Sequence, residues 1–345
     1  MSKGFTYAQS GVNIDVADEA KREIKRLVKQ TFTKGVMSEI GKFGGMYTGK
    51  FPGYKNPILV SSVDGVGTKL KIAAKMKKYD TVGIDLVNHC VDDILVHGAK
   101  PLFFLDYMGM AKTEVNKVSQ IIKGFVKACK AEGCALVGGE TAQMPDVYGG
   151  EDFDLVGLVV GIVDKDKMLD GSKVRAGDKL IGLPSVGLHT NGYTLARKLL
   201  LEKCRLSPDK YIPELKNKLG TELLKPHRSY SKTIFKLLKK YDIHGLAHIT
   251  GGGFKDNIPR VLPEKVSVNI YKGSFPVLPI FKMMQRLGNI EDSEMYRTFN
   301  MGIGMVIMAS AKDTPRIMSD LKKMKEAAYI VGSVVPAEKE RVSLF

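Results

Sequence analysis

Strand-like and helix-like stretches alternate along nearly the whole chain, and this alternation restricts the fold to the α/β classes. Apolar, β-branched runs such as PILVSSVD (57–64) and DLVGLVVGIV (154–163) predict strands. NKVSQIIKGFVKACKAEG (116–133) shows the three- and four-residue spacing of an amphipathic helix. We therefore expect sheets that are covered by helices.

One charged, turn-rich segment interrupts this pattern. DKDKMLDGSKVRAGD, at 164–178, contains few apolar residues, which is typical of a domain boundary. We predict an N-terminal domain over residues 1–165 and a C-terminal α/β domain over residues 175–345. A chain of 345 residues that is 44% hydrophobic can form two cores of this size.

Composition excludes several classes of protein. No stretch approaches the roughly 18 apolar residues of a membrane span, and the N-terminus has no apolar signal core, so we expect a cytoplasmic protein without a membrane partner. The four cysteines form no C-x-x-C pair, which also favours a reducing compartment. The formal charge is +16, but the lysines are scattered at solvent-face spacing, so we expect no nucleic-acid partner.

The stretch SSVDGVGTK (61–69) combines a phosphate-binding loop with an acid. Gly65 and Gly67 let the backbone turn tightly and direct N–H groups at an anion, and Lys69 adds a positive charge. A carboxylate about 4 Å from a phosphate oxygen is opposed by roughly 4 kcal/mol at an effective dielectric near 20. We therefore interpret Asp64 as a ligand of a metal ion that binds the phosphate.

Other acids support this interpretation. Asp92 and Asp93 lie in the helical stretch CVDDI, Asp106 ends the strand FFLD, and Glu140 follows LVGG. Mg²⁺ takes oxygen ligands and shares them between carboxylates and substrate phosphates, so these acids predict a metal–triphosphate site. For any single acid, a role in a turn or in solvent remains an equal alternative.

Two polar loops of the second half form another candidate site. SVGLHTNGY leads into a predicted helix, and HITGGGFKDN places three glycines between a strand and a helix, as in helix N-terminal anion sites. Helix capping and simple turns are the alternatives. These loops make His189 and His248 the catalytic candidates. His89 and His97 lie on a predicted helix and are interpreted as structural or surface residues. His227 and His244 have no supporting polar neighbours in the sequence.

The standard nucleotide motifs are incomplete. GGMYTGK (44–50) has P-loop spacing, but Phe51 replaces the Ser or Thr that binds Mg²⁺, and Pro52 and Pro57 prevent the helix that should follow. A glycine-rich flap and an ordinary surface loop are both open interpretations of this stretch. No complete G-x-G-x-x-G follows a strand, and the cysteines and histidines show no metal-binding spacing.

Several long strings, in order from about Tyr7 to Val335, resemble one family. They are SVDGVGTKL, GIDLV, GAKPLFFLDY, LVGGETAQMPDVY, SVGLHTNGY, HITGGGFKDNIPRVLP and EMYRTFNMGIGMV. By these strings the chain is similar to the aminoimidazole ribonucleotide synthetases, or phosphoribosylformylglycinamidine cyclo-ligases, of purine biosynthesis.

The resemblance implies a homodimer of two-domain α/β subunits, in which N-terminal strands of both subunits form a barrel-like core beside an ATP site. It also implies a reaction of small molecules, in which ATP and formylglycinamidine ribonucleotide give aminoimidazole ribonucleotide, ADP and phosphate. Transfer of the γ-phosphoryl group to the formyl oxygen would create a leaving group, and the amidine nitrogen would then close the ring.

The resemblance also implies roles for particular residues, with ATP and Mg²⁺ as cofactors. The metal ligands would be Asp64, Asp93 and Glu140. The ATP or phosphate ligands would be Gly65, Val66, Gly67, Thr68, Lys69, Asp93, Gly139, Glu140 and Thr141. The ribonucleotide would contact Thr190, Asn191, Gly192, Thr250, Gly251, Gly252 and Gly253. The catalytic residues would be His189, Lys69 and His248.

Three positions depart from the family pattern: Asn13 replaces a common Asp, Asp92 a usual Asn, and Gln143 a frequent Glu. The alternatives are selenophosphate synthetase, thiamine monophosphate kinase and a non-catalytic RNA-binding protein. The first would need a reactive Cys or selenocysteine near the N-terminus, whereas the first cysteine here is Cys90. The second would not require HITGGG or TFNMGIGM, and the third would bind RNA in a salt-dependent way without ATP turnover.

Overall fold

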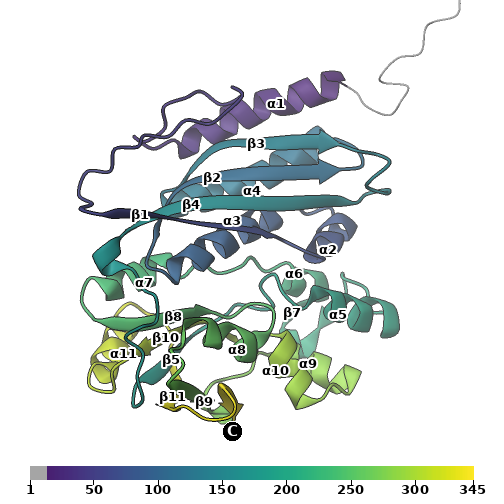
Figure 1. Cartoon of the computed structure of the whole chain (residues 1–345). Helices are drawn as coiled ribbons and strands as arrows, with labels where there is room; N and C mark the ends of the chain where they lie inside the picture. The colour runs from purple at the N-terminus through teal and green to yellow at the C-terminus, as the bar shows by residue number, and fades with distance from the viewer. Residues whose placement is uncertain (1–13) are drawn as a thin grey trace, which may run out of the picture.

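The computed structural model describes residues 14–345, which form two α/β domains joined by one chain segment (Figure 1). The expected two-domain α/β organisation is confirmed. Asn13, one of the departures from the family pattern, lies outside the described residues. Within residues 14–345, no helix combines the length and the apolar character that crossing a membrane requires.

The N-terminal domain is a mixed four-stranded sheet with helices packed against it. The strand order is β1-β4-β2-β3, in which β2 and β3 are parallel and the other neighbours are antiparallel. The described elements of this domain are α1 (Ile14–Val28), β1 (Pro57–Gly65), α2 (Lys69–Met76), α3 (Asp80–Leu95), β2 (Lys100–Met110), α4 (Val115–Glu132), β3 (Ala135–Gln143) and β4 (Phe153–Asp164).

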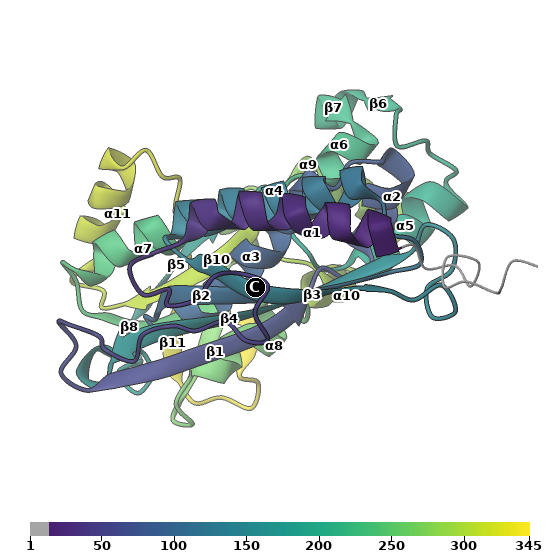
Figure 2. The ribbon, with the colours of Figure 1, turned by 90° about the horizontal axis from the view of Figure 1, so that it is seen from above.

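Helices α3 and α4 pack together on one face of this sheet, and α1 packs against α4. Seen from above, α1 and α4 run side by side (Figure 2). Ala20, Leu27 and Val28 of α1 are buried, as the apolar spacing of that helix predicts. The opposite face of the sheet is partly uncovered, since Leu59 and Val63 of β1 are 60% and 62% exposed.

The C-terminal domain contains a six-stranded sheet of order β12-β9-β11-β5-β10-β8. Its described strands are β5 (Lys179–Pro184), β8 (Ile243–His248), β9 (Val266–Ile270), β10 (Ile303–Ala309), β11 (Tyr329–Pro336) and β12 (Val342–Leu344), and β6 (Tyr211–Ile212) pairs separately with β7 (Asn217–Lys218). Its described α-helices are α5 (Tyr193–Arg197), α6 (Leu219–Leu223), α7 (Ser231–Leu238), α8 (Gly253–Asn257), α9 (Pro279–Gly288), α10 (Asp292–Thr298) and α11 (Thr314–Lys323).

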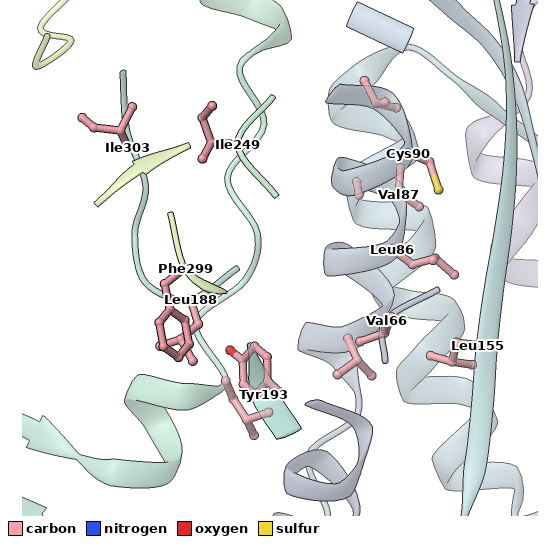
Figure 3. Close-up of a cluster of buried hydrophobic side chains, with 14 of the residues drawn as sticks. Val66, Leu86, Val87, Cys90, Leu155, Leu188, Tyr193, Ile249, Phe299 and Ile303 are labelled. Carbon is pink, nitrogen blue, oxygen red and sulfur yellow. The ribbon is translucent and has the colours of Figure 1, made fainter. Parts of the chain in front are cut away.

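Apolar packing continues from one domain to the other. Figure 3 shows Leu86 and Cys90 of α3 near Leu155 of β4, together with Leu188 and Tyr193 of the second domain. All five side chains belong to one buried cluster. Because this shared core fixes α3 against the loops of the C-terminal domain, polar side chains on α3 can make precise contacts across the interface.

Candidate functional site

The candidate site lies where α3 and the end of β1 meet the C-terminal domain. Asp64 lies near the end of β1, Asp93 lies on α3, and His248 ends β8. The loops also meet here, because Thr68 Oγ1 lies 3.0 Å from Thr194 Oγ1. Phosphate-loop and glycine-loop residues that are far apart in sequence are therefore neighbours in space.

His89, on α3, connects Asp64 to the second domain. Its Nε2 lies 2.9 Å from Asp64 Oδ2, and its Nδ1 lies 2.6 Å from Thr190 Oγ1. Burial acts to lower the pKa of His89, but the hydrogen bond to Asp64 and the nearby Asp93 charge raise it above its ordinary value. His89 is buried, so it is not a surface residue. The interpretation of His89 as structural stays open, although it contacts both a predicted metal ligand and a predicted ribonucleotide ligand.

His227 and His248 continue this network to the other acid. Thr190 Oγ1 lies 3.4 Å from His227 Nδ1, and His227 Nε2 lies 3.1 Å from His248 Nε2. His248 Nδ1 lies 2.9 Å from Asp93 Oδ1, and Ser62 Oγ donates to Asp93 Oδ2 at 3.1 Å. Asp64 and Asp93 are thus the two ends of one hydrogen-bonded chain, in which His227 has neighbours that its sequence context did not reveal.

The contacts within this network shift the pKa values of its carboxylates and imidazoles. Burial acts to raise the pKa of Asp93, but the hydrogen bond from His248 and the charge of His89 hold it below its ordinary value. Burial likewise opposes ionisation of Asp64, and His89 outweighs it, so the pKa of Asp64 is also lowered. Burial lowers the pKa of His248 despite the Asp93 contact. His248 is therefore a neutral imidazole held by a carboxylate, as a general base requires.

His189 is placed differently from His248. Its side chain is 1% exposed and stacks on His227, with 4.0 Å between ring centroids. Val186 N donates to His189 Nε2 at 3.3 Å, and the backbone of His189 is left-handed, with φ of 61°. Burial lowers the pKa of this imidazole well below its ordinary value. In this conformation His189 packs behind His227, and its catalytic role stays a prediction.

Lys69 does not lie at a phosphate site in this structure. Its side chain is fully buried, and its Nζ lies 2.8 Å from Asp85 Oδ1, 3.0 Å from the His189 carbonyl oxygen and 2.7 Å from the Lys225 carbonyl oxygen. An ammonium group has three donors, and all three have protein acceptors here. Contact between Lys69 and ATP stays a prediction, and it would require Nζ to exchange at least one of these acceptors for a phosphate oxygen. In this structure Lys69 joins the two domains.

The rest of the DGVGTK loop is also engaged with the protein. Gly65 N donates to Asp64 Oδ1 at 2.6 Å, and Val66 N donates to the Leu155 carbonyl oxygen at 3.4 Å. Gly67 has φ of 69°, a conformation that favours glycine, so its presence here follows from the turn. Phosphate binding by Gly65 and Val66 would require these N–H groups to exchange partners, and it stays a prediction.

Glu140 is separated from the other predicted metal ligands. It lies on β3, whereas Asp64 lies on β1, at the opposite edge of the sheet. Three strand spacings of about 4.8 Å separate these strands. Within one chain, Glu140 therefore lies apart from Asp64, and its place around a shared metal ion stays a prediction.

Glu140 lines a different cavity, of about 720 Å³, together with Gly139 and Thr141. This cavity lies between α1, the glycine-rich loop 41–45 and β3. Asp106 lines it as well, and burial raises the pKa of Asp106 to about 7. The glycine-rich stretch thus borders a cavity, as a flap would, and the three predicted ATP ligands of β3 lie together.

The two glycine-containing loops of the C-terminal domain touch each other. A Cβ on Gly251 would lie 3.1 Å from Asn191 Oδ1. Asn257 Nδ2 donates to the carbonyl oxygens of Gly251 and Gly253 at 3.1 and 2.8 Å, which holds the triple-glycine turn in place. The remaining predicted ribonucleotide ligands, Thr190, Gly192, Thr250 and Gly252, lie in the same two loops.

A smaller cavity, of about 280 Å³, opens beside this cluster. Ser62, Asp93, His248, Asn257 and Arg260 all line it. Arg260 belongs to the short 3₁₀ helix that follows α8, is exposed, and has no ion pair or hydrogen bond with another residue of the described chain. Sequence reasoning did not select Arg260, although it lies within the string IPRVLP that supported the family resemblance.

Asp92 is a fully buried acid next to the site. Its side chain is fully buried, Tyr230 N donates to its Oδ1 at 3.0 Å, and its Oδ2 lies 3.5 Å from His227 Nε2. Burial raises the pKa of Asp92 well above its ordinary value. The folded protein therefore favours the protonated carboxyl group, which resembles the Asn expected from the family pattern.

Asp92→Asn is expected to make the stability of the protein less sensitive to a rise in pH above the unfolded-state pKa of Asp. A raised pKa in the folded state gives stability that is fully present below the unfolded-state pKa of about 3.9 and is lost as pH rises through the folded-state pKa. Asn has no proton to lose. Urea unfolding from pH 5 to 9 should show that the free energy of unfolding of the variant increases relative to that of the wild type as pH rises. A constant difference across this range would contradict the assignment.

Comparisons with known proteins identify family models that match both domains. Residues 54–163 match the family model described as AIR synthase related protein, N-terminal domain, and residues 175–345 match the corresponding C-terminal domain. The chain is 51% identical over 337 residues to a phosphoribosylformylglycinamidine cyclo-ligase from Pseudothermotoga lettingae, which covers 97% of this chain and 98% of that protein.

Solved structures share the fold at low identity. A thiamine-monophosphate kinase from Stenotrophomonas maltophilia matches with a TM-score of 0.67 and 15% identity, over 92% of this chain and 94% of that one. The hydrogenase maturation protein HypE in complex with ATP matches with a TM-score of 0.64 and 15% identity, over 99% and 92%. The two family models, together with 51% identity over 97% of the chain, show that the chain belongs to the AIR synthase related protein family.

Proposed function

We propose that this protein catalyses the ATP-dependent ring closure of formylglycinamidine ribonucleotide to aminoimidazole ribonucleotide, with release of ADP and phosphate, in purine biosynthesis. The observation that carries the proposal is the 51% identity to a phosphoribosylformylglycinamidine cyclo-ligase over 97% of the chain. The network of Asp64, Asp93 and the histidines at the domain interface supplies the groups that this chemistry needs.

The amide oxygen of the formyl group is a poor leaving group, and phosphoryl transfer to it solves that difficulty. The carbon that carries the phosphorylated oxygen is then attacked by the amidine nitrogen, which must lose a proton, and the carbon–oxygen bond breaks to release phosphate. His248 is suited to accept this proton at Nε2 once that nitrogen exchanges its contact with His227 for the substrate, because Asp93 fixes its Nδ1 at 2.9 Å and the imidazole lines the 280 Å³ cavity. Asp93 orients His248 and stabilises the positive charge that forms on it.

A divalent cation is part of the proposal. The two carboxylates Asp64 and Asp93 fit such an ion, because both have lowered pKa values and both are linked through His89. Glu140 of the same chain lies on β3, at the opposite edge of the sheet from Asp64, so it is not included in this set of ligands. Bound Mg²⁺ would neutralise charge on the transferring phosphoryl group.

ATP is proposed to use the 720 Å³ cavity beside β3. Gly139, Glu140 and Thr141 line it, and Lys25 and Lys42 add positive charge at its margin. The volume suits a nucleotide, since ligand cavities commonly measure 300–1,000 Å³. A homodimer is also proposed, because the outer face of the N-terminal sheet leaves Leu59 and Val63 exposed. We place the protein in the cytoplasm, which is supported by four cysteines that are all unpaired.

The ribonucleotide is proposed to bind in the 280 Å³ cavity, with its phosphate at Arg260. The guanidinium group is free of acidic partners within the described chain and lines the same cavity as Asp93 and His248. An arginine can bind a phosphate through two parallel hydrogen bonds. Asn257, one turn earlier, ties this segment to the triple-glycine loop.

Arg260→Ala is expected to raise KM for the ribonucleotide by about 10- to 100-fold, because a charge-assisted pair of hydrogen bonds is lost. KM for ATP and kcat should change by less than about threefold. Steady-state kinetics with each substrate varied in turn will show this. Lys255→Ala, which removes another exposed cation from α8, is the matched control. An unchanged KM for the ribonucleotide would exclude Arg260 as the phosphate ligand.

The function itself is tested with the purified full-length protein. Mass spectrometry should detect aminoimidazole ribonucleotide and ADP in equal amounts, only when ATP, a divalent cation and formylglycinamidine ribonucleotide are all present. ATP hydrolysis without ring closure, or binding of RNA without any turnover, would contradict the proposal.

A further inference from the structure

One aromatic side chain at the 720 Å³ cavity is in contact with solvent rather than with the core. Phe43 lines this cavity and is fully exposed. Phenylalanine carries a large apolar surface, and its ring face can pack on another flat ring. An exposed ring that borders a ligand cavity is therefore available to a bound ligand.

The loop that carries Phe43, residues 38–46, has a fixed base. Met37 N donates to the Met46 carbonyl oxygen at 2.8 Å, and Met46 N donates to Ser38 Oγ at 2.9 Å. These two hydrogen bonds tie the ends of the loop to each other. The base of the loop therefore keeps its place when the tip moves.

The tip of the loop is held much less firmly. Within the described part of the chain, residues 41–44 make no hydrogen bond to another residue. Phe43 lies between Gly41, whose φ is 88°, and Gly44, where an added Cβ would meet no atom within 4 Å. At Gly45, by contrast, a Cβ would lie 2.8 Å from a carbonyl oxygen of β3. The glycines thus leave the tip free to move toward the cavity, while Gly45 stays packed on the sheet.

The rest of the cavity lining combines an apolar wall with positive charge. Phe103 and Leu105 of β2 and Val137 of β3 contribute apolar side chains, and Lys25 and Lys42 contribute ammonium groups. A nucleoside triphosphate carries both of the matching chemistries, a flat aromatic base and a chain of phosphates. The apolar wall suits the base, and the lysines suit the phosphates.

We propose that Phe43 stacks on the adenine base of ATP and that the loop 38–46 closes over the bound nucleotide. The base then lies between the Phe43 ring and the apolar wall of β2 and β3, so that both of its faces are removed from water. The inference rests on the proposed placement of ATP in this cavity. It gives the glycine-rich stretch that begins at Gly44 the role of a flap rather than of a surface loop.

Fluorescence gives a direct test, because the chain contains no tryptophan and Phe43→Trp adds a single reporter at the tip of the loop. ATP with Mg²⁺, added to the full-length variant without ribonucleotide, should quench its emission, since the indole stacks on the base. Tripolyphosphate, which has no base, should leave the emission unchanged. Met37→Trp is the matched control, because Met37 is exposed at the base of the same loop and does not line the cavity. Its emission should not respond to ATP.

Calorimetry measures what the ring contributes to affinity. Phe43→Ala should weaken ATP binding by at least about tenfold, whereas Phe43→Tyr, which keeps an aromatic face, should stay within about threefold of the wild type. Tripolyphosphate should bind the wild type and Phe43→Ala equally well.

Equal ATP affinity of Phe43→Ala and the wild type would overturn the inference, as would an unchanged emission of Phe43→Trp when calorimetry shows that ATP is bound. Protection of the Phe43→Trp indole from iodide before ATP is added would mean that another surface covers this position, and would overturn it as well. Because no ribonucleotide is present, these results leave the ring-closure reaction standing. A failed turnover assay likewise leaves an ATP-dependent change in emission standing.

Discussion

Replacing Asp93 by Asn is expected to lower kcat for ring closure by about 10³- to 10⁴-fold, the size of effect seen when a carboxylate that orients a catalytic imidazole becomes an amide. Asp93 accepts hydrogen bonds from both Ser62 and His248. Asn keeps the shape of the side chain but removes the charge that holds a cation and stabilises the imidazolium form of His248. The change therefore affects chemistry more than packing.

Single-turnover kinetics with saturating substrates will measure this loss, and circular dichroism will show whether the fold is kept. Asp242→Asn is the control, because Asp242 is an exposed carboxylate that pairs with Lys173. That variant should retain kcat within about twofold, since exposed ion pairs contribute little. Activity of Asp93→Asn within tenfold of the wild type would show that the Asp93–His248 pair does not act in the reaction.

Lys69→Met is expected to lower the free energy of unfolding by about 3–5 kcal/mol, the usual cost of removing one partner from a buried ion pair. The substitution leaves Asp85 without its counter-charge in a fully buried position. It also leaves the carbonyl oxygens of His189 and Lys225 without a donor. Because Lys69 belongs to the N-terminal domain and these two carbonyl oxygens belong to the C-terminal domain, the contact between the domains should weaken as well.

Urea unfolding at neutral pH will measure the loss. The double variant Lys69→Met/Asp85→Leu is the matched control, because it removes both charges and should recover part of the stability that the single variant loses. A single variant as stable as the wild type would mean that Lys69 has no structural role, and the original assignment to ATP would then need to be reconsidered.

Much of the fold follows from periodicity. The predicted strands 57–64 and 154–163 correspond to β1 (Pro57–Gly65) and β4 (Phe153–Asp164). Periodicity does not determine which strands become neighbours, so the order β1-β4-β2-β3 could not be read from the sequence. The apolar spacing of FPVLPIFKMMQRLG (275–288) predicts a helix, but α9 begins only at Pro279, because proline is favoured in the first turn of a helix.

Site residues could be predicted from the sequence where the residues next to them indicate their role. Asp64 and Asp93 were selected from their loop and helix, and both belong to the observed network. The separation of Glu140 from Asp64 could not be read from the sequence, because it depends on the strand order, in which β4 and β2 lie between β1 and β3. His89 was missed because its contact with Thr190 spans 101 residues of sequence. Only its four-residue spacing from Asp93 could have indicated a shared role.

The central claim is that this protein phosphorylates the formyl oxygen of its substrate and then closes the ring. Formylglycinamidine ribonucleotide labelled with ¹⁸O in the formyl group tests it directly, with mass spectrometry of the released phosphate. The account predicts that each aminoimidazole ribonucleotide formed is accompanied by one phosphate that carries the ¹⁸O atom. Unlabelled phosphate, with the ¹⁸O released into water, would contradict it.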